Sequence, residues 1–309
     1  MRYVIGGDIG GTNLRFALIN EDGEIVKRAG TITPDDKQET ANEIMSLIEK
    51  VSSEPFKIAI GVGGLVDFEQ GKVIYTPNFD FSEIPLKKLV EKRFNISCLV
   101  DNDANTAAWG EKIYGSAKTA KNFVCITLGT GIGGGLVINN EIYRGSYFAA
   151  GEIGHTTIGY TKDVKAFPDN SDYENLASGK ALGKLARSEI KEDSESLILT
   201  MAKGKVEDIN GKTVTAAALK GDEVALELLS RHGEIIGIGL ANLVNVFDPE
   251  MIVLTGGLAT AGELILPDIE KGLYQRIFAP DYRKPKLVVG ELGSDAGLIG
   301  AAAMAFFPK

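Results

Sequence analysis

Cysteine, histidine and tryptophan are scarce in this sequence of 309 residues, which has two, two and one of them. So few thiols and imidazoles leave a structural zinc site short of ligands. Cys98 and Cys125 stand in short apolar runs that predict strands. We therefore expect both to be small core residues rather than a disulfide or metal pair.

Long apolar runs and an excess of basic charge are also missing. No run approaches the roughly 18 to 20 apolar residues needed to span a bilayer, and no basic N-terminal segment leads into a signal-type apolar region. The formal charge is −9, and an acidic protein gains no counterion release from nucleic acid or an anionic membrane. We expect a cytoplasmic protein with no nucleic-acid or membrane partner.

Apolar runs and turns alternate through the first third of the chain. Asp22-Gly23 between apolar runs predicts a hairpin, so residues 3 to 30 are expected to form three antiparallel strands. The elements expected next are a helix over 38–53, a strand over 57–64, a hairpin over 65–78, a helix over 85–94, a strand over 96–102 and a helix over 103–115.

The polar residues 116–122 then suggest a domain boundary. Beyond them we expect a loop-rich segment over 145–175, helices over 176–203 and 213–246, strands over 251–255 and 286–292, and a last helix over 295–307. Strands and helices alternate, which predicts the α/β class. The length favours two domains with a cleft between them.

An internal repeat links the two halves. Shifting the chain by 119 residues lays DIGGTNLRFALIN, from Asp8, over TLGTGIGGGLVIN, from Thr127. Each segment predicts a strand, a glycine turn and a returning strand. Such a repeat suggests two domains of similar topology.

Glycine turns of this kind have several explanations. We find no P-loop, which needs a lysine and Ser/Thr after its last glycine. Gly129, Gly131 and Gly134 have the Rossmann spacing, but that motif opens a helix and a strand is expected here. Ordinary tight hairpins, in which glycine supplies a positive φ, remain an alternative explanation. Two turns in register favour a pair that offers backbone N–H groups to a polyphosphate, with Asp8 holding its magnesium.

Four motifs together resemble the ROK family of sugar kinases: DIGGT at the N-terminus, DNDAN at 101–105, LGTGIGGG at 128–135 and GEIGH at 151–155. The resemblance covers essentially the whole chain. It implies a two-domain actin-like ATPase (ribonuclease H-like) fold, in which each domain is a mixed sheet flanked by helices. The activity implied is that of a glucokinase, with ATP and Mg²⁺ as cofactors, a sugar as substrate and a homodimer as assembly.

The resemblance also assigns the site residues. Asp103 is implied as the general base, although its place at the start of a helix also suits an ordinary N-cap. The implied sugar ligands are Gly63, Gly64, Asn78, Asn102, Asp103, Glu152, His155 and Glu174. The implied nucleotide ligands are Asp8, Gly10, Gly11, Thr12, Asn13, Arg15, Thr130, Gly131, Gly256, Gly257 and Leu258.

One departure from the family concerns zinc. Many ROK proteins follow the GEIGH-type histidine with three cysteines that bind zinc. Those positions hold Lys165, Phe167 and Asp172 here, so we expect no structural zinc. Inward packing of Phe167 is one way to order residues 156–173 without it.

The prediction is therefore a kinase with a small domain, residues 1–115 plus 298–309, and a large domain, 116–297, that close over Mg·ATP and a hexose and exclude water. Glucose is the expected sugar. Fructose, mannose, allose and N-acetylhexosamines remain alternatives. A sugar-sensing repressor is disfavoured because only seven residues precede Asp8, and a scaffold role is disfavoured by Asp103 and Glu152.

Overall fold

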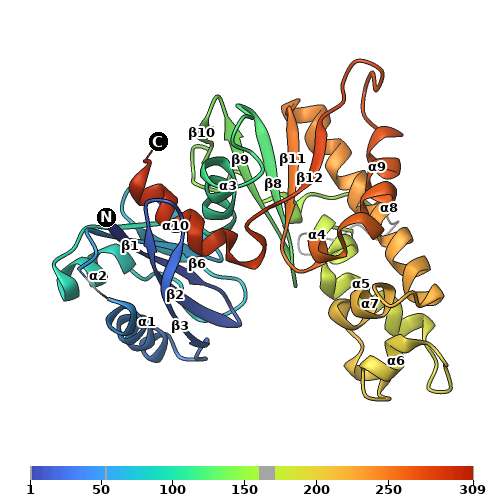
Figure 1. Cartoon of the computed structure of the whole chain (residues 1–309), viewed down its shortest axis with the longest axis horizontal. Helices are drawn as coiled ribbons and strands as arrows, with labels where there is room; N and C mark the ends of the chain where they lie inside the picture. Colours follow the sequence, from blue (N-terminus) through green and yellow to red (C-terminus); the bar gives the residue numbers. More distant parts are fainter. Residues whose placement is uncertain (1, 53, 160–170, 309) are drawn as a thin grey trace. The chain divides into compact units, whose positions relative to one another are not determined.

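The structure is a computed structural model that describes residues 2–52, 54–159 and 171–308 (Figure 1). The chain divides into two compact units. Unit 1 comprises Met1–Cys125, Gly135–Gly151 and Gly290–Lys309, and unit 2 comprises Ile126–Gly134 and Glu152–Val289. The α/β class predicted from the alternation of elements is confirmed.

A five-stranded sheet in the order β3-β2-β1-β4-β7 forms the centre of unit 1. Its strands are β1 Tyr3–Ile9, β2 Asn13–Asn20, β3 Ile25–Ile32, β4 Lys57–Val62 and β7 Cys98–Asn102. The first three are antiparallel, as the Asp22-Gly23 signal predicts. β1, β4 and β7 run parallel, so their carboxyl ends meet at one edge of the sheet.

Helices cover both faces of this sheet. Ile5 and Ile9 of β1 pack in one apolar core with α1 (Lys37–Val51) and α2 (Leu86–Phe94). Val4, one residue out of phase, packs in a second core with α10 (Ala296–Phe306). Alternate side chains of a strand point to opposite faces, so each face has its own core.

Helix α3 (Asp103–Ile113) lies against α10. Gly300 of α10 permits the approach, because a Cβ there would stand 1.7 Å from the carbonyl oxygen of Thr106. Glu111 is fully buried, and its carboxylate accepts bonds from the backbone N–H groups of Ser116, Glu291 and Leu292. It thus fixes the segment that leads into α10.

The second five-stranded sheet has the order β10-β9-β8-β11-β12. Its strands are β8 Phe123–Leu128, β9 Ile132–Ile138, β10 Glu141–Ile142, β11 Met251–Thr255 and β12 Lys286–Val289. The boundary between the two units falls within β8 and β9. A small hairpin, β5 (Leu65–Asp67) with β6 (Lys72–Tyr75), belongs to unit 1.

Unit 2 is otherwise mainly helical. Its α-helices are α4 Tyr173–Ala177, α5 Gly179–Glu189, α6 Leu197–Met201, α7 Gly211–Ala218, α8 Glu223–Phe247 and α9 Leu266–Tyr274. Short 3₁₀ turns include η1 Ile153–His155 and η3 Leu258–Leu264. Helices occupy the predicted ranges 176–203 and 213–246, with two in each range, because new helices begin at the capping side chains of Ser178, Ser196 and Asp222.

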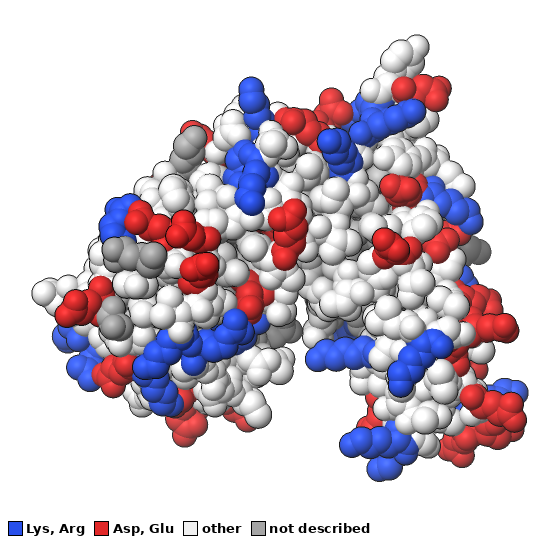
Figure 2. All heavy atoms as spheres, in the orientation of Figure 1, with Lys and Arg blue, Asp and Glu red and all other residues white. Residues whose placement is uncertain are grey.

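Both cysteines are buried within strands, as predicted. Burial raises the pKa of the Cys98 thiol well above its usual range, which keeps that thiol protonated and unreactive. Acidic and basic side chains are interspersed over the face shown in Figure 2. None of the described helices combines the length and the apolar character of a membrane-spanning segment.

The limits of the units differ from the domains predicted from the sequence. Residues 116–125, 135–151 and 290–297 group with unit 1, whereas the sequence assigns them to the larger domain. The predicted domain limits stay a prediction.

Candidate active site

Asp8 lies near the end of β1, just before the first glycine turn. Its carboxylate is paired with the guanidinium of Arg15 on β2 and is only 14% exposed. The same guanidinium donates to the carbonyl oxygen of Ser294 at 2.8 Å and lies 3.9 Å from a carboxylate oxygen of Asp295. Asp8 is thus a charged group at the edge of the sheet, where a parallel-stranded fold binds its ligands.

The turn after Asp8 is exposed and closely supported. Gly10 donates its N–H to the carbonyl oxygen of Asn13 at 3.0 Å. The hydroxyl of Thr33 donates to the carbonyl oxygen of Gly10, and the backbone N–H of Thr33 donates to that of Thr12. A Cβ on Gly11 would lie 2.9 Å from the Cβ of Asn78. Unit 1 therefore brings the predicted phosphate turn against a predicted sugar ligand, Asn78.

Asp103 stands at the junction of β7 and α3, but it is not the cap of the helix. The N-cap is Asn102, whose side-chain oxygen accepts from Ala104 N at 2.8 Å and Asn105 N at 3.1 Å. The capping explanation offered for Asp103 is therefore wrong. Asp103 is the first helical residue, where the helix dipole favours an ionised carboxylate.

The two glycines of the β4 turn lie beside this junction. A Cβ on Gly63 would stand 3.4 Å from Oδ2 of Asp103. Asn102 Nδ2 donates to the carbonyl oxygen of Gly64 at 3.0 Å. Because an amide nitrogen carries two hydrogens, Asn102 can still donate once to a ligand. Gly63, Gly64, Asn102 and Asp103 thus form one cluster.

In unit 2, Glu152 and His155 of the GEIGH motif meet across the η1 turn, with 3.7 Å between Oε2 and Nε2. Partial burial raises the pKa of the Glu152 carboxyl, whose side chain is still 44% exposed. The nearby His155 opposes this shift and Glu174 adds to it. The three predicted sugar ligands of this unit therefore share one electrostatic environment.

Glu174, in the first turn of α4, supports the second glycine turn. Its Oε2 accepts the N–H of Ile132 at 2.8 Å, and a Cβ on Gly131 would stand 2.3 Å from that oxygen. Asp172, at one of the family's cysteine positions, is buried and caps α4 by accepting from Asn175 N at 2.7 Å. Asp172 has thus become a helix cap.

Lys165 and Phe167, at the other two cysteine positions, lie outside the described residues, so the predicted packing of Phe167 stays a prediction. Within the described part of the chain, no group of three or more His, Cys, Asp or Glu side chains could hold a metal ion.

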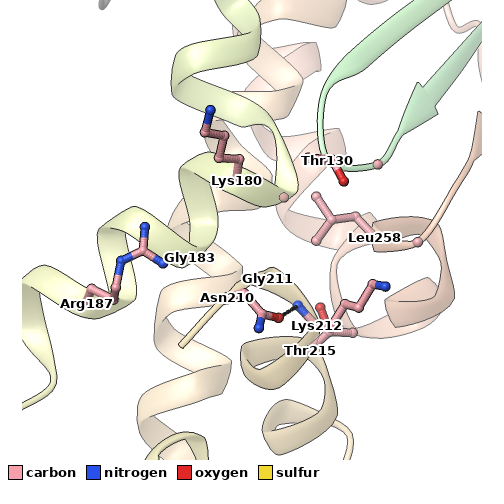
Figure 3. A pocket seen from close by; sticks show the side chains of 12 residues that line it. Thr130, Lys180, Gly183, Arg187, Asn210, Gly211, Lys212, Thr215 and Leu258 are labelled. Carbon is pink, nitrogen blue, oxygen red and sulfur yellow. Dashed lines mark hydrogen bonds between the residues drawn. The ribbon is translucent and has the colours of Figure 1, made fainter. Parts of the chain in front are cut away.

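A cavity of about 530 Å³ opens beside the second glycine turn (Figure 3). It is lined by Gly129, Thr130, Gly179, Lys180, Gly183, Arg187, Asn210, Gly211, Lys212, Thr215, Gly257 and Leu258. In Figure 3, Lys180 and Arg187 of α5 lie on one side of the cavity and Thr130 and Leu258 on the other. Among the described residues that line the cavity, three are cationic and none is a carboxylate, so the cavity suits an anionic ligand.

Three of the predicted nucleotide residues, Thr130, Gly257 and Leu258, line this cavity. Gly256 does not line the cavity, but its backbone conformation allows the segments beside the cavity to pack closely. Its φ of +88° requires glycine, and a Cβ there would stand 2.6 Å from the carbonyl oxygen of Leu128. The predicted adenosine loop and the second hairpin are therefore in direct contact within unit 2.

The α5 and α7 side of the cavity was not predicted from the sequence. One signal for it is present: Gly211-Lys212-Thr213 has the glycine-lysine-threonine ending of a P-loop. Val206 replaces the first glycine of that motif, and the ending opens α7 without a preceding strand. Asn210 caps α7 by accepting from Lys212 N at 3.0 Å.

Comparison with known proteins agrees with the motifs. The sequence profile of the ROK family matches residues 4–306. A glucokinase from Streptomyces coelicolor is 34% identical over 313 residues, which cover 100% of this chain and 99% of the relative. A xylose repressor from Caldicellulosiruptor bescii is 32% identical, covering 97% of this chain and 77% of the repressor.

Among solved structures, a ROK family glucokinase from Streptomyces griseus in complex with glucose and AMPPNP superimposes with a TM-score of 0.89. It is 34% identical, and the match covers 98% of each chain. The predicted actin-like ATPase fold, with mixed sheets flanked by helices, is thereby confirmed. The chain belongs to the ROK family.

Proposed function

We propose that this protein is an ATP-dependent sugar kinase that transfers the γ-phosphoryl group of Mg·ATP to a hydroxyl of glucose, yielding glucose 6-phosphate. The observation that carries the proposal is the Asp103 carboxylate at the start of α3, beside the Gly63–Gly64 turn. The glucokinase relatives, and the solved relative that contains glucose and AMPPNP, support glucose as the substrate.

Asp103 would act as the general base. Phosphoryl transfer to an alcohol needs a carboxylate that accepts the hydroxyl proton while the phosphates are held by metal and backbone groups. Asn102, with one amide hydrogen left to donate, would orient a neighbouring hydroxyl. Glu152, His155 and Glu174, which unit 2 gathers together, would bind the remaining hydroxyls.

Mg·ATP would use both glycine turns. Asp8 has the hard oxygen donors that Mg²⁺ prefers, and its position at the end of β1 suits a ligand to the metal of Mg·ATP. The cavity lined by Thr130, Gly257 and Leu258 has the size and charge for a nucleotide. We further propose a cytoplasmic homodimer whose domains are residues 1–115 plus 298–309 and 116–297.

A coupled ADP-release assay over a panel of hexoses and N-acetylhexosamines with Mg·ATP tests this function. We expect glucose to give the highest kcat/KM. A different preferred sugar would keep the kinase and correct the substrate. No stimulation of ADP release above the water background by any sugar would refute the kinase and favour a sugar-binding regulator or a scaffold.

Asp103→Asn tests the role of the base in the same assay. Because a general base contributes about 10²- to 10⁴-fold, turnover should fall by that factor while calorimetry still detects ATP and sugar binding. Turnover close to that of the wild type would remove Asp103 from the role.

A further inference from the structure

A buried ion pair lies directly behind the proposed base. Asp101, two residues before Asp103, is 3% exposed, and Arg144 is 15% exposed. Oδ2 of Asp101 accepts from Nε of Arg144 at 2.9 Å and lies 2.8 Å from its Nη2. The ring of Phe68 lies against the guanidinium, 3.7 Å from its carbon to the ring centroid. All four residues belong to unit 1.

The other oxygen of Asp101 holds the turn that carries Asp103. Oδ1 accepts the N–H of Asn102 at 2.7 Å and Nδ2 of Asn105 at 3.0 Å. The carboxylate therefore binds the residue before Asp103 and the residue two positions after it. Its own position depends on Arg144, because an unpaired charge at this depth is strongly destabilising.

Arg144 also fixes the segment that precedes the GEIGH motif. Its carbonyl oxygen accepts the N–H of Ala150 at 3.1 Å, and Gly145, at φ +73°, makes the intervening bend. The side chain and the backbone of one arginine thus tie this loop to the end of β7. Lysine could not replace it, because an ammonium lacks both the fork and the flat face that lies on Phe68.

We propose that Arg144 is a positioning residue for phosphoryl transfer, which acts through Asp101 to hold Asp103 and Asn102 in place. The inference rests on the proposed function, since it assigns Asp103 as the base. A displacement of about 1 Å at a reacting group can lower the rate about 10²-fold. Loss of Arg144 should therefore lower kcat more than it weakens binding.

The test compares Arg144→Met with the double variant Asp101→Asn/Arg144→Met. Methionine keeps an unbranched stem but removes the guanidinium, and with it the charge, the donors and the flat face that lies on Phe68. We expect Arg144→Met to lower kcat by about 10- to 100-fold with the KM for ATP within about threefold of wild type. The double variant leaves no buried charge, and asparagine still accepts from Asn102 and Asn105, so we expect it to recover at least about fivefold in kcat.

Arg283→Met is the matched control. Arg283 is 19% exposed, pairs with Asp248 at 2.7 Å and donates to the carbonyl oxygen of Val244. Its loss should lower the Tm and leave kcat within twofold, as a purely structural arginine would. If Arg144→Met does not fold, the double variant and Arg144→Lys carry the comparison, with Arg144→Lys expected to remain impaired.

Three outcomes would overturn the inference: an unchanged kcat in folded Arg144→Met, a rise confined to the KM for the sugar, or no recovery in the double variant. The first would make the pair purely structural, and the second would make Arg144 a substrate ligand. In each case wild-type activity in the same assay keeps the proposed function standing. An inactive wild type would instead refute the proposed function, and this inference with it.

Discussion

The two glycine hairpins have matching sequences and different surroundings. At the end of β1, Asp8 faces an arginine. At the matched position of β8, the hydroxyl of Thr127 accepts the N–H of Gly133 at 3.1 Å, inside its own hairpin. The first turn offers a carboxylate, and the second offers backbone beside a cationic cavity. The repeat thus preserves a backbone shape while the chemistry of the two copies has diverged.

The largest expected difference between the hairpins is electrostatic. Asp8→Asn should lower kcat/KM for Mg·ATP by about 100-fold or more, about 3 kcal/mol, because it removes a charge from the proposed metal ligand. Sugar affinity, measured by calorimetry, should stay within threefold. Thr127→Val, the matched change, removes one hydrogen bond and should cost about 1 kcal/mol of stability. Equal loss of turnover in both variants would contradict the assigned difference.

A steric test separates the turns next. Gly131→Ala places a methyl group 2.3 Å from the Glu174 carboxylate, and such overpacking should cost about 2 to 3 kcal/mol. Gly10→Ala, whose Cβ would meet the nearest atom at 3.7 Å, is the steric control and should leave the free energy of unfolding unchanged. Denaturant unfolding measures this free energy in both variants. Similar losses in the two variants would show that the Glu174 contact does not matter.

Acidic pH should destabilise α4 and α8, which support the second hairpin, more than the strands of the first hairpin. On α8, His232 lies 2.9 Å, Nε2 to oxygen, from the carbonyl of Ala177 at the end of α4, the helix that carries Glu174. Burial lowers the pKa of His232 to about 4, from an ordinary 6.5. Below pH 6.5 the unfolded chain therefore binds a proton that the folded chain refuses, so stability falls as the pH drops towards 4. At pH 5 the loss is about 2 kcal/mol.

Hydrogen exchange at pH 7 and pH 5, corrected for intrinsic rates, measures this effect. The amides of α4 and α8 should lose protection, whereas those of β1 and β2 should not. His232→Gln, which cannot take up a proton, should abolish the difference. An unchanged pH dependence in that variant would show that other groups are responsible.

The sequence predicted best what is local or periodic. Apolar runs broken by glycine located β1, β2 and β9, and the motifs located the candidate site residues. Capping was predicted less well, because Asn102 and Asp103 are both good capping residues and only the backbone at the junction decides between them.

Contacts distant in sequence were not predictable. Lys180 and Lys212 reach one cavity from different helices, and Arg144 finds Asp101 across 43 residues. Nothing in the local sequence distinguishes these cations from the many others on the surface. The role of each cation depends on which charged group it contacts, and the packing of helices and strands determines that contact.

The sequence by itself determined the family, the α/β class and the paired glycine turns, because period, turn chemistry and motif spacing are properties of neighbouring residues. Only the tertiary structure decided that Asn102 caps the helix, that Glu174 supports the second turn, and that Arg144 neutralises Asp101. Each of these depends on a buried polar group finding its partner. Burial makes such a partner necessary, and the fold selects which residue provides it.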